Sequence, residues 1–214
     1  MSQPAGEETG ETIAFYEEAA ETAAERWVDR DAMRGHLDRF AALLKSSSLV
    51  VDLGCGAGYD CRQLASRGVR VLGVDLALAP LRIGCARYPE AQFARQDIRS
   101  LGLRTECVDG IWACASLLHI PRRLMRAALG EVHRVLRPGG ILFTSVQGGH
   151  GEAVVQDETY GTSRARLYVY YESGEWLGLL REDGFDVIHS QLDYHEESLD
   201  PGGKCWLVSF ARRV

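Results

Sequence analysis

The sequence predicts an α/β fold in which helices cover a mostly parallel sheet. Apolar runs of strand length alternate with segments of helical periodicity from residue 49 onward. The first such run, Leu49 to Leu53, ends directly in a turn that holds three glycines at alternate positions. Two apolar runs at 185–191 and 205–212 follow one another without a helix between them, which predicts an antiparallel edge of the sheet.

The segment before the first strand predicts helices. Residues 1–11 are polar and acidic, which is typical of a disordered or mobile tail. From about Thr12 to Lys45 the chain is rich in Ala, Glu and Arg with apolar residues at helical spacing, so we expect two helices broken near Asp29 to Asp31. Residues 12–47 would then form a helical cap on a single domain that spans 12–214.

Strands and helices alternate regularly through the central segment. The first two strands and the helix between them predict a βαβ unit with a right-handed crossover. The run Arg137-Pro138-Gly139-Gly140 ends a later helix, because proline blocks its continuation and glycine supplies a left-handed turn. The expected elements are strands at 49–53 and 69–74, a helix at 78–88, strands at 91–94 and 108–114, a helix at 121–136, a strand at 141–146, a helix at 175–183 and the two closing strands.

Residues 147–173 show no regular period, because Gly, Thr, Ser and charged residues are interleaved with tyrosines. This segment is too long for a routine connection, so it predicts an insertion. We expect it to cover the open end of the sheet together with the N-terminal helices.

The composition argues against several classes of protein. The chain has 24 Lys and Arg against 30 Asp and Glu, a net charge of −6, which does not favour a surface that follows nucleic-acid phosphates. The six cysteines form no C-x-x-C pair and the histidines show no metal-ligand spacing, so we predict a reducing cytoplasm and no metal. Neither a signal peptide nor an apolar stretch near about 18 residues is present, so we expect no membrane association. We expect a monomer or a homodimer.

The turn at Gly54, Gly56 and Gly58 predicts a site for a nucleoside cofactor. Glycine lets the backbone take positive φ angles and lets a ligand approach the main chain. A dinucleotide fingerprint needs a third glycine three places after the second, but Tyr59 or Cys61 stands there, depending on the pair of glycines taken. The spacing therefore argues against a nicotinamide cofactor.

Suitable side chains also follow the other strands, and ligands of open α/β sheets bind at the carboxyl ends of strands. Asp75 could accept both hydroxyls of a ribose, and Asp97 with Ile98 could contact an adenine. Small residues around Cys114 suit an ammonium group, and Asp60 enters a helix whose N-terminal amides suit a carboxylate. An acid at such a position can instead cap the next helix, so the prediction depends on the full set.

Together these motifs resemble the class I S-adenosylmethionine (SAM) dependent methyltransferases. The motifs are DLGCGAG at 52–58, GVD at 73–75, QDI at 96–98, DGIWACASLLH at 109–119 and EVHRVLRPGG at 131–140, and the last is characteristic of the subgroup that acts on small molecules. The resemblance covers roughly residues 49–147. It implies a Rossmann-like sandwich with a seven-stranded sheet of order 3-2-1-4-5-7-6, in which strand 7 is antiparallel. It implies cofactor contacts at Asp52, Gly54, Cys55, Gly56, Asp60, Asp75, Leu76, Asp97, Ile98 and Cys114.

The acceptor of the methyl group should meet the N-terminal helices and the insertion. His119 lies just past the fourth strand and is the candidate base or acceptor contact, with local packing as the alternative. A base is needed only if the acceptor keeps its proton, since methyl transfer mainly requires positioning. The expected acceptor contacts are Tyr16, Trp27, His119, His150, Tyr168, Tyr170 and Tyr171.

The function predicted in this way is transfer of a methyl group from SAM to an O or N atom of a small molecule in secondary metabolism, with S-adenosylhomocysteine (SAH) as the product. Two other functions stay open. One is methylation of a peptide or protein side chain or terminus, and the other is non-catalytic binding of SAM or SAH. The sequence does not identify the acceptor.

Overall fold

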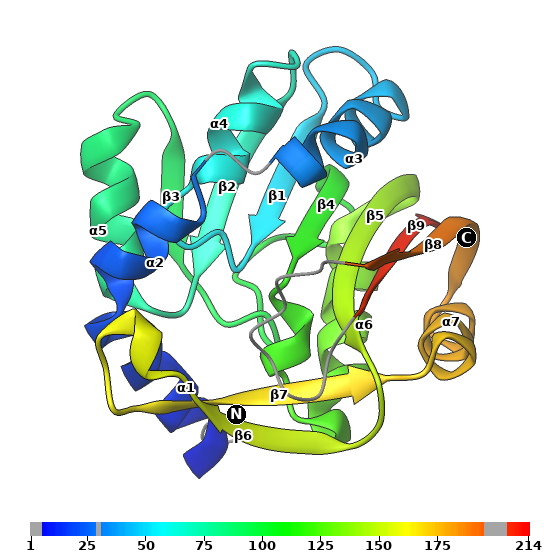
Figure 1. Cartoon of the computed structure of the whole chain (residues 1–214). Helices are drawn as coiled ribbons and strands as arrows, with labels where there is room; N and C mark the ends of the chain where they lie inside the picture. Colours follow the sequence, from blue (N-terminus) through cyan, green and yellow to red (C-terminus); the bar gives the residue numbers. More distant parts are fainter. Residues whose placement is uncertain (1–5, 29–30, 195–204) are drawn as a thin grey trace.

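The computed structural model describes residues 6–28, 31–194 and 205–214. The strands of this part are β1 (Leu49–Leu53), β2 (Arg70–Asp75), β3 (Gln92–Arg95), β4 (Val108–Cys114), β5 (Leu136–Gly148), β6 (Glu152–Gln156), β7 (Ala165–Tyr171), β8 (Phe185–Tyr194) and β9 (Cys205–Arg213). Its helices are α1 (Glu7–Glu18), α2 (Ala20–Arg26), α3 (Asp31–Ala42), α4 (Tyr59–Ala65), α5 (Leu78–Arg87), α6 (Met125–Val135) and α7 (Ser173–Glu182). Figure 1 shows their arrangement.

The nine strands form one sheet. Its order is β3-β2-β1-β4-β5-β7-β6, and β9 pairs with β5 and with β8. Without β6 and β7, the order is β3-β2-β1-β4-β5-β9-β8. If these seven strands are numbered along the chain, β8 and β9 become strands 6 and 7, and the order is the expected 3-2-1-4-5-7-6. The last strand, β9, is antiparallel to β5. The predicted Rossmann-like sandwich is therefore confirmed, with two strands more than the expected seven.

The two additional strands come from the segment 147–173. β6 and β7 form an antiparallel hairpin, and Gln147 and Gly148 of β5 pair in parallel with Tyr170 and Tyr171 of β7. All residues of β7 after Ala165 are buried. A strand that is covered on both faces does not alternate between polar and apolar residues, so β7 has no strand period that can be detected.

The N-terminal segment contains three helices where the sequence predicted two. α1 begins at Glu7, so the predicted tail at 1–11 is too long, and a break at Ala19 separates α1 from α2. Asp29 of the predicted break lies outside the described residues, and α3 begins at Asp31. Residues 1–5 also lie outside the described part.

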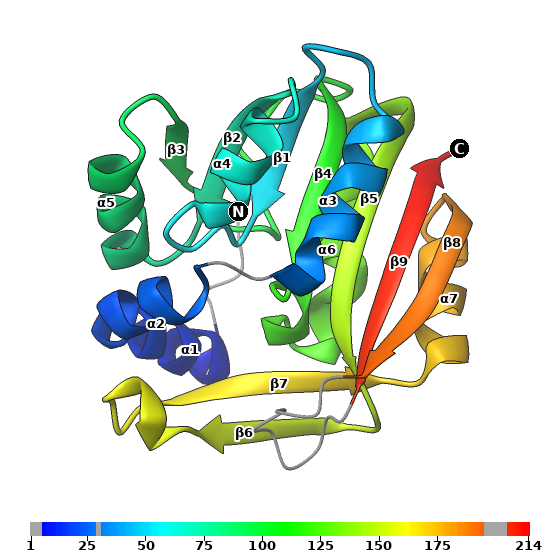
Figure 2. The same ribbon diagram turned by 45° about the horizontal axis from the view of Figure 1, so that its top comes forward.

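The two faces of the sheet are covered by different helices. Val50 of β1 belongs to a cluster with Phe40 of α3 and Leu64 of α4, while the next residue, Val51, belongs to a cluster with Val132 of α6 and with α7. Successive side chains of a strand point to opposite faces, so β1 is buried on both sides. Figure 2 shows α3 and α4 in front of the sheet and α6 behind it.

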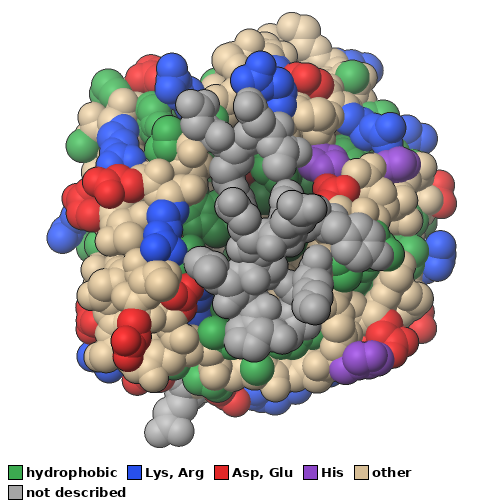
Figure 3. All heavy atoms as spheres, viewed as in Figure 1, with side chains coloured by type: hydrophobic (Ala, Val, Ile, Leu, Met, Phe, Trp, Pro, Cys, Tyr) green, Lys and Arg blue, Asp and Glu red, His purple; other side chains and the backbone are tan. Residues whose placement is uncertain are grey.

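The described surface shows charges of both signs. On the face shown in Figure 3, Lys and Arg side chains are interspersed with Asp and Glu, and the side chains coloured there form no continuous basic area. Among the helices described, each is too short or too polar to span a bilayer.

Helix α1 is attached to α5 through Glu17. The Glu17 carboxylate accepts hydrogen bonds from the amides of Leu78 (2.6 Å) and Ala79 (2.8 Å), which begin α5. The N-cap residue of α5, Ala77, has no side chain that could satisfy these amides. Glu17 therefore caps a helix whose first residue, Leu78, lies 61 residues further along the chain.

Replacement of Glu17 should destabilise the protein. We expect Glu17→Ala to lower the free energy of unfolding by about 1–2 kcal/mol, because a lost N-cap leaves helix amides unpaired. Urea unfolding followed by circular dichroism measures this change. Glu21→Ala is the matched control, because the Glu21 carboxylate is 77% exposed and lies 3.8 Å from its partner Arg87. An equal loss in both variants would contradict the capping role.

Candidate active site

A cavity lies at the carboxyl ends of β1, β2 and β4. Figure 2 shows α1 and α2 beyond the ends of these strands. Its lining includes all ten residues for which the sequence implied cofactor contact. Residues of α1, α2 and α3 complete the wall opposite the strand ends. One cavity thus brings together the strand ends and the N-terminal helices.

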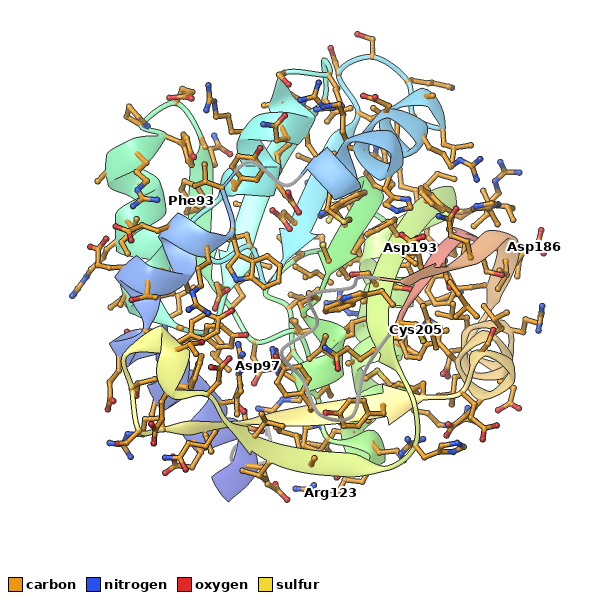
Figure 4. The ribbon with its side chains drawn as sticks, viewed as in Figure 1. Phe93, Asp97, Arg123, Asp186, Asp193 and Cys205 are labelled. Carbon is orange, nitrogen blue, oxygen red and sulfur yellow. The ribbon has the colours of Figure 1, made fainter. Side chains whose placement is uncertain are left out.

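The turn after β1 needs glycine at two positions because of close neighbours. Gly54 has φ +70°, and a Cβ there would lie 2.4 Å from Cβ of Ser116. Gly58 has φ +79°, and a Cβ there would lie 2.5 Å from the ring of Phe93, which Figure 4 labels on β3. At Gly56 a Cβ would meet no atom within 4 Å. The backbone is therefore packed at both ends of the turn and open at its centre, where a ligand can approach the main chain.

Asp75 holds this turn from the end of β2. Its Oδ2 accepts a hydrogen bond from the amide of Gly56 and its Oδ1 accepts one from the amide of Ala77, both at 2.9 Å. Burial raises the pKa of Asp75, and the two amides partly oppose that effect. Each carboxylate oxygen keeps a further lone pair, so Asp75 can also accept the two hydroxyls of a ribose.

Two more acids lie beside the turn. Burial, followed by the charge of Asp60, raises the pKa of Asp52. The Asp60 carboxylate accepts a hydrogen bond from the indole N–H of Trp112 at 2.8 Å. This acidic end of the cavity suits a cationic ligand group such as an ammonium or a sulfonium.

The two thiols at the turn have raised pKa values. Burial raises the pKa of Cys55 to about 11, and the pKa of Cys61 is raised by its hydrogen bond with Cys55 and by burial. The Cys61 thiol donates to Asp52 at 3.2 Å. Both thiols therefore stay protonated at neutral pH and behave as small side chains that fill space.

Asp97 follows β3 on the same side of the sheet (Figure 4). Its Oδ2 accepts a hydrogen bond from Nη2 of Arg99 at 2.6 Å. Burial alone would raise the pKa of Asp97, but the hydrogen bonds from Arg99 lower it overall. Asp97 is therefore an ionised acceptor, next to Ile98, where the sequence predicted an adenine contact.

The end of β4 is strained beside the cavity. Ala115, directly after Cys114, has φ +51°, a left-handed conformation that costs a residue with a side chain about 1–2 kcal/mol. The Ala115 amide is held by Ser145, whose Oγ accepts it at 3.0 Å. The strain turns the chain sharply between Cys114 and Ser116, both of which line the cavity.

Tyr16, Trp27 and His119 also line the cavity. His119 Nδ1 lies 2.6 Å from the carbonyl of Leu167, and its Nε2 lies 2.8 Å from the hydroxyl of Tyr16. A carbonyl can only accept, so Nδ1 carries the proton, and the lone pair of Nε2 accepts the Tyr16 O–H. Burial lowers the pKa of His119 to about 3, so the imidazole is neutral.

Four of the expected acceptor contacts do not line the cavity. Tyr168, Tyr170 and Tyr171 are buried in the core, where Tyr168 packs on His119 and Tyr171 packs on Trp176. His150 is 80% exposed and pairs with Glu172. In Figure 2, β7 runs below α1, and the two elements are in contact. No described residue of β7 lines the cavity, so its aromatic residues support the wall instead of forming it.

Some lining residues were not expected from the sequence. They come from α1 to α3 and from the loop after β4, and include Thr9, Thr12, Ile13, Ala20, Ala23, Met33, Ser116 and Ile120. Small and apolar residues at helical spacing indicate a buried face but do not indicate whether that face meets protein or ligand. No group of His, Cys, Asp and Glu within the described ranges is arranged to hold a metal ion.

Comparison with known proteins finds a similar family over part of the chain. Residues 50–140 match the family described as a methyltransferase domain. This match covers less than half of the chain. Together with the sheet order and the glycine turn, it makes the chain similar to the class I SAM-dependent methyltransferase domains. Ligands of open α/β sheets bind at the carboxyl ends of the strands, and the cavity lies at those ends.

Individual relatives differ in their acceptors. The chain is 32% identical over 127 residues to a malonyl-[acyl-carrier protein] O-methyltransferase of Pectobacterium atrosepticum. This match covers 50% of this chain and 47% of that protein. The chain is also 36% identical over 102 residues to a trans-aconitate 2-methyltransferase of Paracidovorax citrulli. That match covers 46% of this chain and 38% of that protein. The chain thus matches less than half the length of these curated relatives.

A solved structure matches over the whole chain. It is the 1,6-didemethyltoxoflavin-N1-methyltransferase of Burkholderia thailandensis with bound 1,6-didemethyltoxoflavin and SAH, at a TM-score of 0.77 and 24% identity. The match covers 100% of this chain and 93% of that one. At this identity the likeness shows the shared fold.

The role of Asp75 can be tested by binding. We expect Asp75→Asn to weaken SAH binding at least tenfold, because hydrogen bonds to a charged acceptor contribute about 1.5–3 kcal/mol. Isothermal titration of the purified protein with SAH measures the dissociation constant. Asp38→Asn is the control, since the Asp38 carboxylate is 63% exposed and pairs with Arg67 away from the cavity. Unchanged affinity in Asp75→Asn would remove Asp75 from the cofactor site.

The neutral state of His119 predicts a pH-dependent stability. The ordinary pKa of 6.5 falls to about 3 on folding, so below pH 6.5 the unfolded chain binds a proton that the folded protein excludes. Stability is therefore lost as the pH falls. Between pH 6 and pH 5 this site should cost about 1.2 kcal/mol.

The matched variant for this measurement is His119→Gln, whose amide can donate to Leu167 and accept from Tyr16 without titrating. The difference in unfolding free energy between the two proteins, measured with urea at each pH, isolates the contribution of His119. A difference that does not change with pH would contradict a neutral buried imidazole.

Proposed function

We propose that this protein transfers the methyl group of SAM to an O or N atom of a small molecule. One observation carries the proposal: a single cavity joins the acidic, glycine-lined strand ends to a wall of Tyr16, Trp27 and His119. A second reactant can therefore lie next to the cofactor, out of bulk water. A domain that only sensed SAM would not need this additional space.

SAM supplies an activated methyl group, because its sulfonium sulfur leaves as a neutral thioether. In the reaction the acceptor forms a new bond to the methyl carbon while the carbon–sulfur bond breaks with its electron pair on sulfur, and the acceptor loses a proton. Alignment of the three atoms can contribute up to about 7–11 kcal/mol. The glycine turn, Asp75 and the strained end of β4 would provide this alignment from the cofactor side.

His119 does not serve as the base in this proposal. Both of its ring nitrogens are engaged, and protonation of a group with a pKa of about 3 is unfavourable at neutral pH. The four acids of the described lining lie at the strand ends, where the proposal assigns them to the cofactor. The lining also holds Arg99, which is a permanent cation, together with the side chains of Tyr16, Tyr59, Cys55 and Cys114. We therefore infer an acceptor that is nucleophilic without a base, and a proton that leaves to solvent.

The wall opposite the strand ends is uncharged. The described lining residues from α1, α2 and α3 include neither a carboxylate nor a cationic side chain, whereas the curated relatives act on malonyl-[acyl-carrier protein] and trans-aconitate. A charged acceptor would lose its hydration there without gaining an ion pair. This lining supports a neutral, mainly apolar acceptor, as is common among secondary metabolites.

The proposal predicts labelled product from small molecules. The protein is incubated with SAM that carries a trideuterated methyl group and with separate panels of neutral small molecules and peptides, and mass spectrometry detects labelled products. We expect a labelled small molecule in an amount equal to the SAH formed, and a rate at least tenfold lower in Asp75→Asn at limiting SAM. A labelled peptide would instead favour peptide modification, and SAH binding without any labelled product would contradict catalysis.

A further inference from the structure

The hydroxyl of Tyr16 has its proton committed to the protein. Nδ1–H of His119 donates to the Leu167 carbonyl, which leaves Nε2 as an acceptor for the Tyr16 O–H at 2.8 Å. Burial raises the pKa of Tyr16 despite the nearby charge of Arg166, so the phenol keeps its proton. Tyr16 therefore donates to His119 and to nothing else.

Arg166 approaches the same hydroxyl from β7. Its Nη1 donates to the Tyr16 oxygen at 3.3 Å, and its Nη2 pairs with Asp157 at 3.3 Å. The guanidinium is almost fully buried and lies over the rings of Phe15 (4.4 Å) and Tyr160 (4.5 Å). Its rigid fork can donate but cannot accept, so it fixes which lone pair of Tyr16 is used.

These contacts leave the Tyr16 oxygen with one type of interaction to offer. Its O–H is used by His119 and one lone pair is used by Arg166, so a lone pair is what remains for a ligand in the cavity. A ligand group that can only accept, such as an ether or a carbonyl oxygen, would face that lone pair without a proton between them. A group that donates would complete the hydrogen-bond set.

We propose that Tyr16 selects a neutral aromatic acceptor that presents an O–H or N–H group to it. The inference rests on the proposed function, because it concerns the molecule that enters beside the cofactor. The neighbouring Trp27 and Ile13 supply an apolar surface for a flat ring. Tyr16 is the contact, and His119 and Arg166 are positioning residues that fix the direction of its hydroxyl.

Two probes of the same shape test this selection. In the SAH-loaded protein, 2-naphthol can donate a hydrogen bond, whereas 2-methoxynaphthalene can only accept one. We expect 2-naphthol to bind at least tenfold more tightly by isothermal titration. Equal binding of the two probes, tighter binding of the ether, or no binding of 2-naphthol would overturn the proposal.

Substitutions assign the preference to Tyr16. We expect Tyr16→Phe to abolish the preference while SAH affinity stays within twofold. Tyr160→Phe, which loses a hydroxyl from another ring packed on Arg166 but outside the cavity lining, should keep it. A large loss of SAH affinity in Tyr16→Phe would place Tyr16 in the cofactor site and overturn the selection role.

Variants of His119 separate positioning from simple support of the fold. His119→Gln can still accept from Tyr16 and should keep the preference. His119→Phe frees the Tyr16 O–H to donate into the cavity, so binding of 2-methoxynaphthalene should improve relative to 2-naphthol although Tyr16 is present. The same preference in both variants would overturn the positioning role. Titration with SAH comes first in every case, so that failure of the cofactor site is seen separately from failure of acceptor selection.

Discussion

Helix α1 forms hydrogen bonds with three separate parts of the molecule, and the form of the cavity depends on these bonds. Thr12 accepts from the amide of Leu167 on β7, Tyr16 donates to His119 after β4, and Glu17 accepts from the first amides of α5. The three residues lie within two turns of one helix, so the contacts cannot shift independently. A single rigid element therefore sets the distance between Tyr16 on the cavity wall and the strand ends.

The opposite wall is set by close backbone packing. Gly54 lies against Ser116 and Gly58 lies against Phe93, so the turn after β1 is fixed by β3 and by the loop after β4. Asp75 then binds the amide of Gly56 at the centre of the same turn. Because packed interiors deform little, the two walls meet in a defined geometry, which is what an in-line transfer requires.

The strands of the sheet and the meeting of the expected cofactor contacts in one cavity could be predicted from the sequence, because both follow from local pattern. Each apolar strand ends in a recognisable polar or glycine residue, and parallel strands bring those ends to one edge, so Asp75, Asp97 and Cys114 line the same cavity. β1 and β4 have the predicted bounds. In the hairpin β6–β7, strand β7 was missed because a strand buried on both faces has no alternation to detect.

The cavity wall that contains Tyr16 and Trp27 could not be predicted to the same extent, because tertiary packing decides which side chains reach the cavity. Tyr16 and Trp27 line the cavity as expected, but nothing local distinguishes them from Tyr168 and Tyr171, which are buried behind the wall. The burial of Arg166 among aromatic rings is also invisible in the sequence, since a charged residue on a strand normally faces water. Such placements become evident only when α1 and β7 are seen side by side.

The insertion nevertheless acts on the cavity, through hydrogen-bond polarity. The carbonyl of Leu167 on β7 determines which nitrogen of His119 carries the proton, and that choice determines where the Tyr16 O–H points. If Nδ1 met a donor instead, Nε2 would carry the proton and Tyr16 would be free to donate into the cavity. A hairpin that does not line the cavity can thus decide whether the wall offers a proton or a lone pair. Related domains with other insertions at this edge could select other acceptors without any change at the cofactor residues.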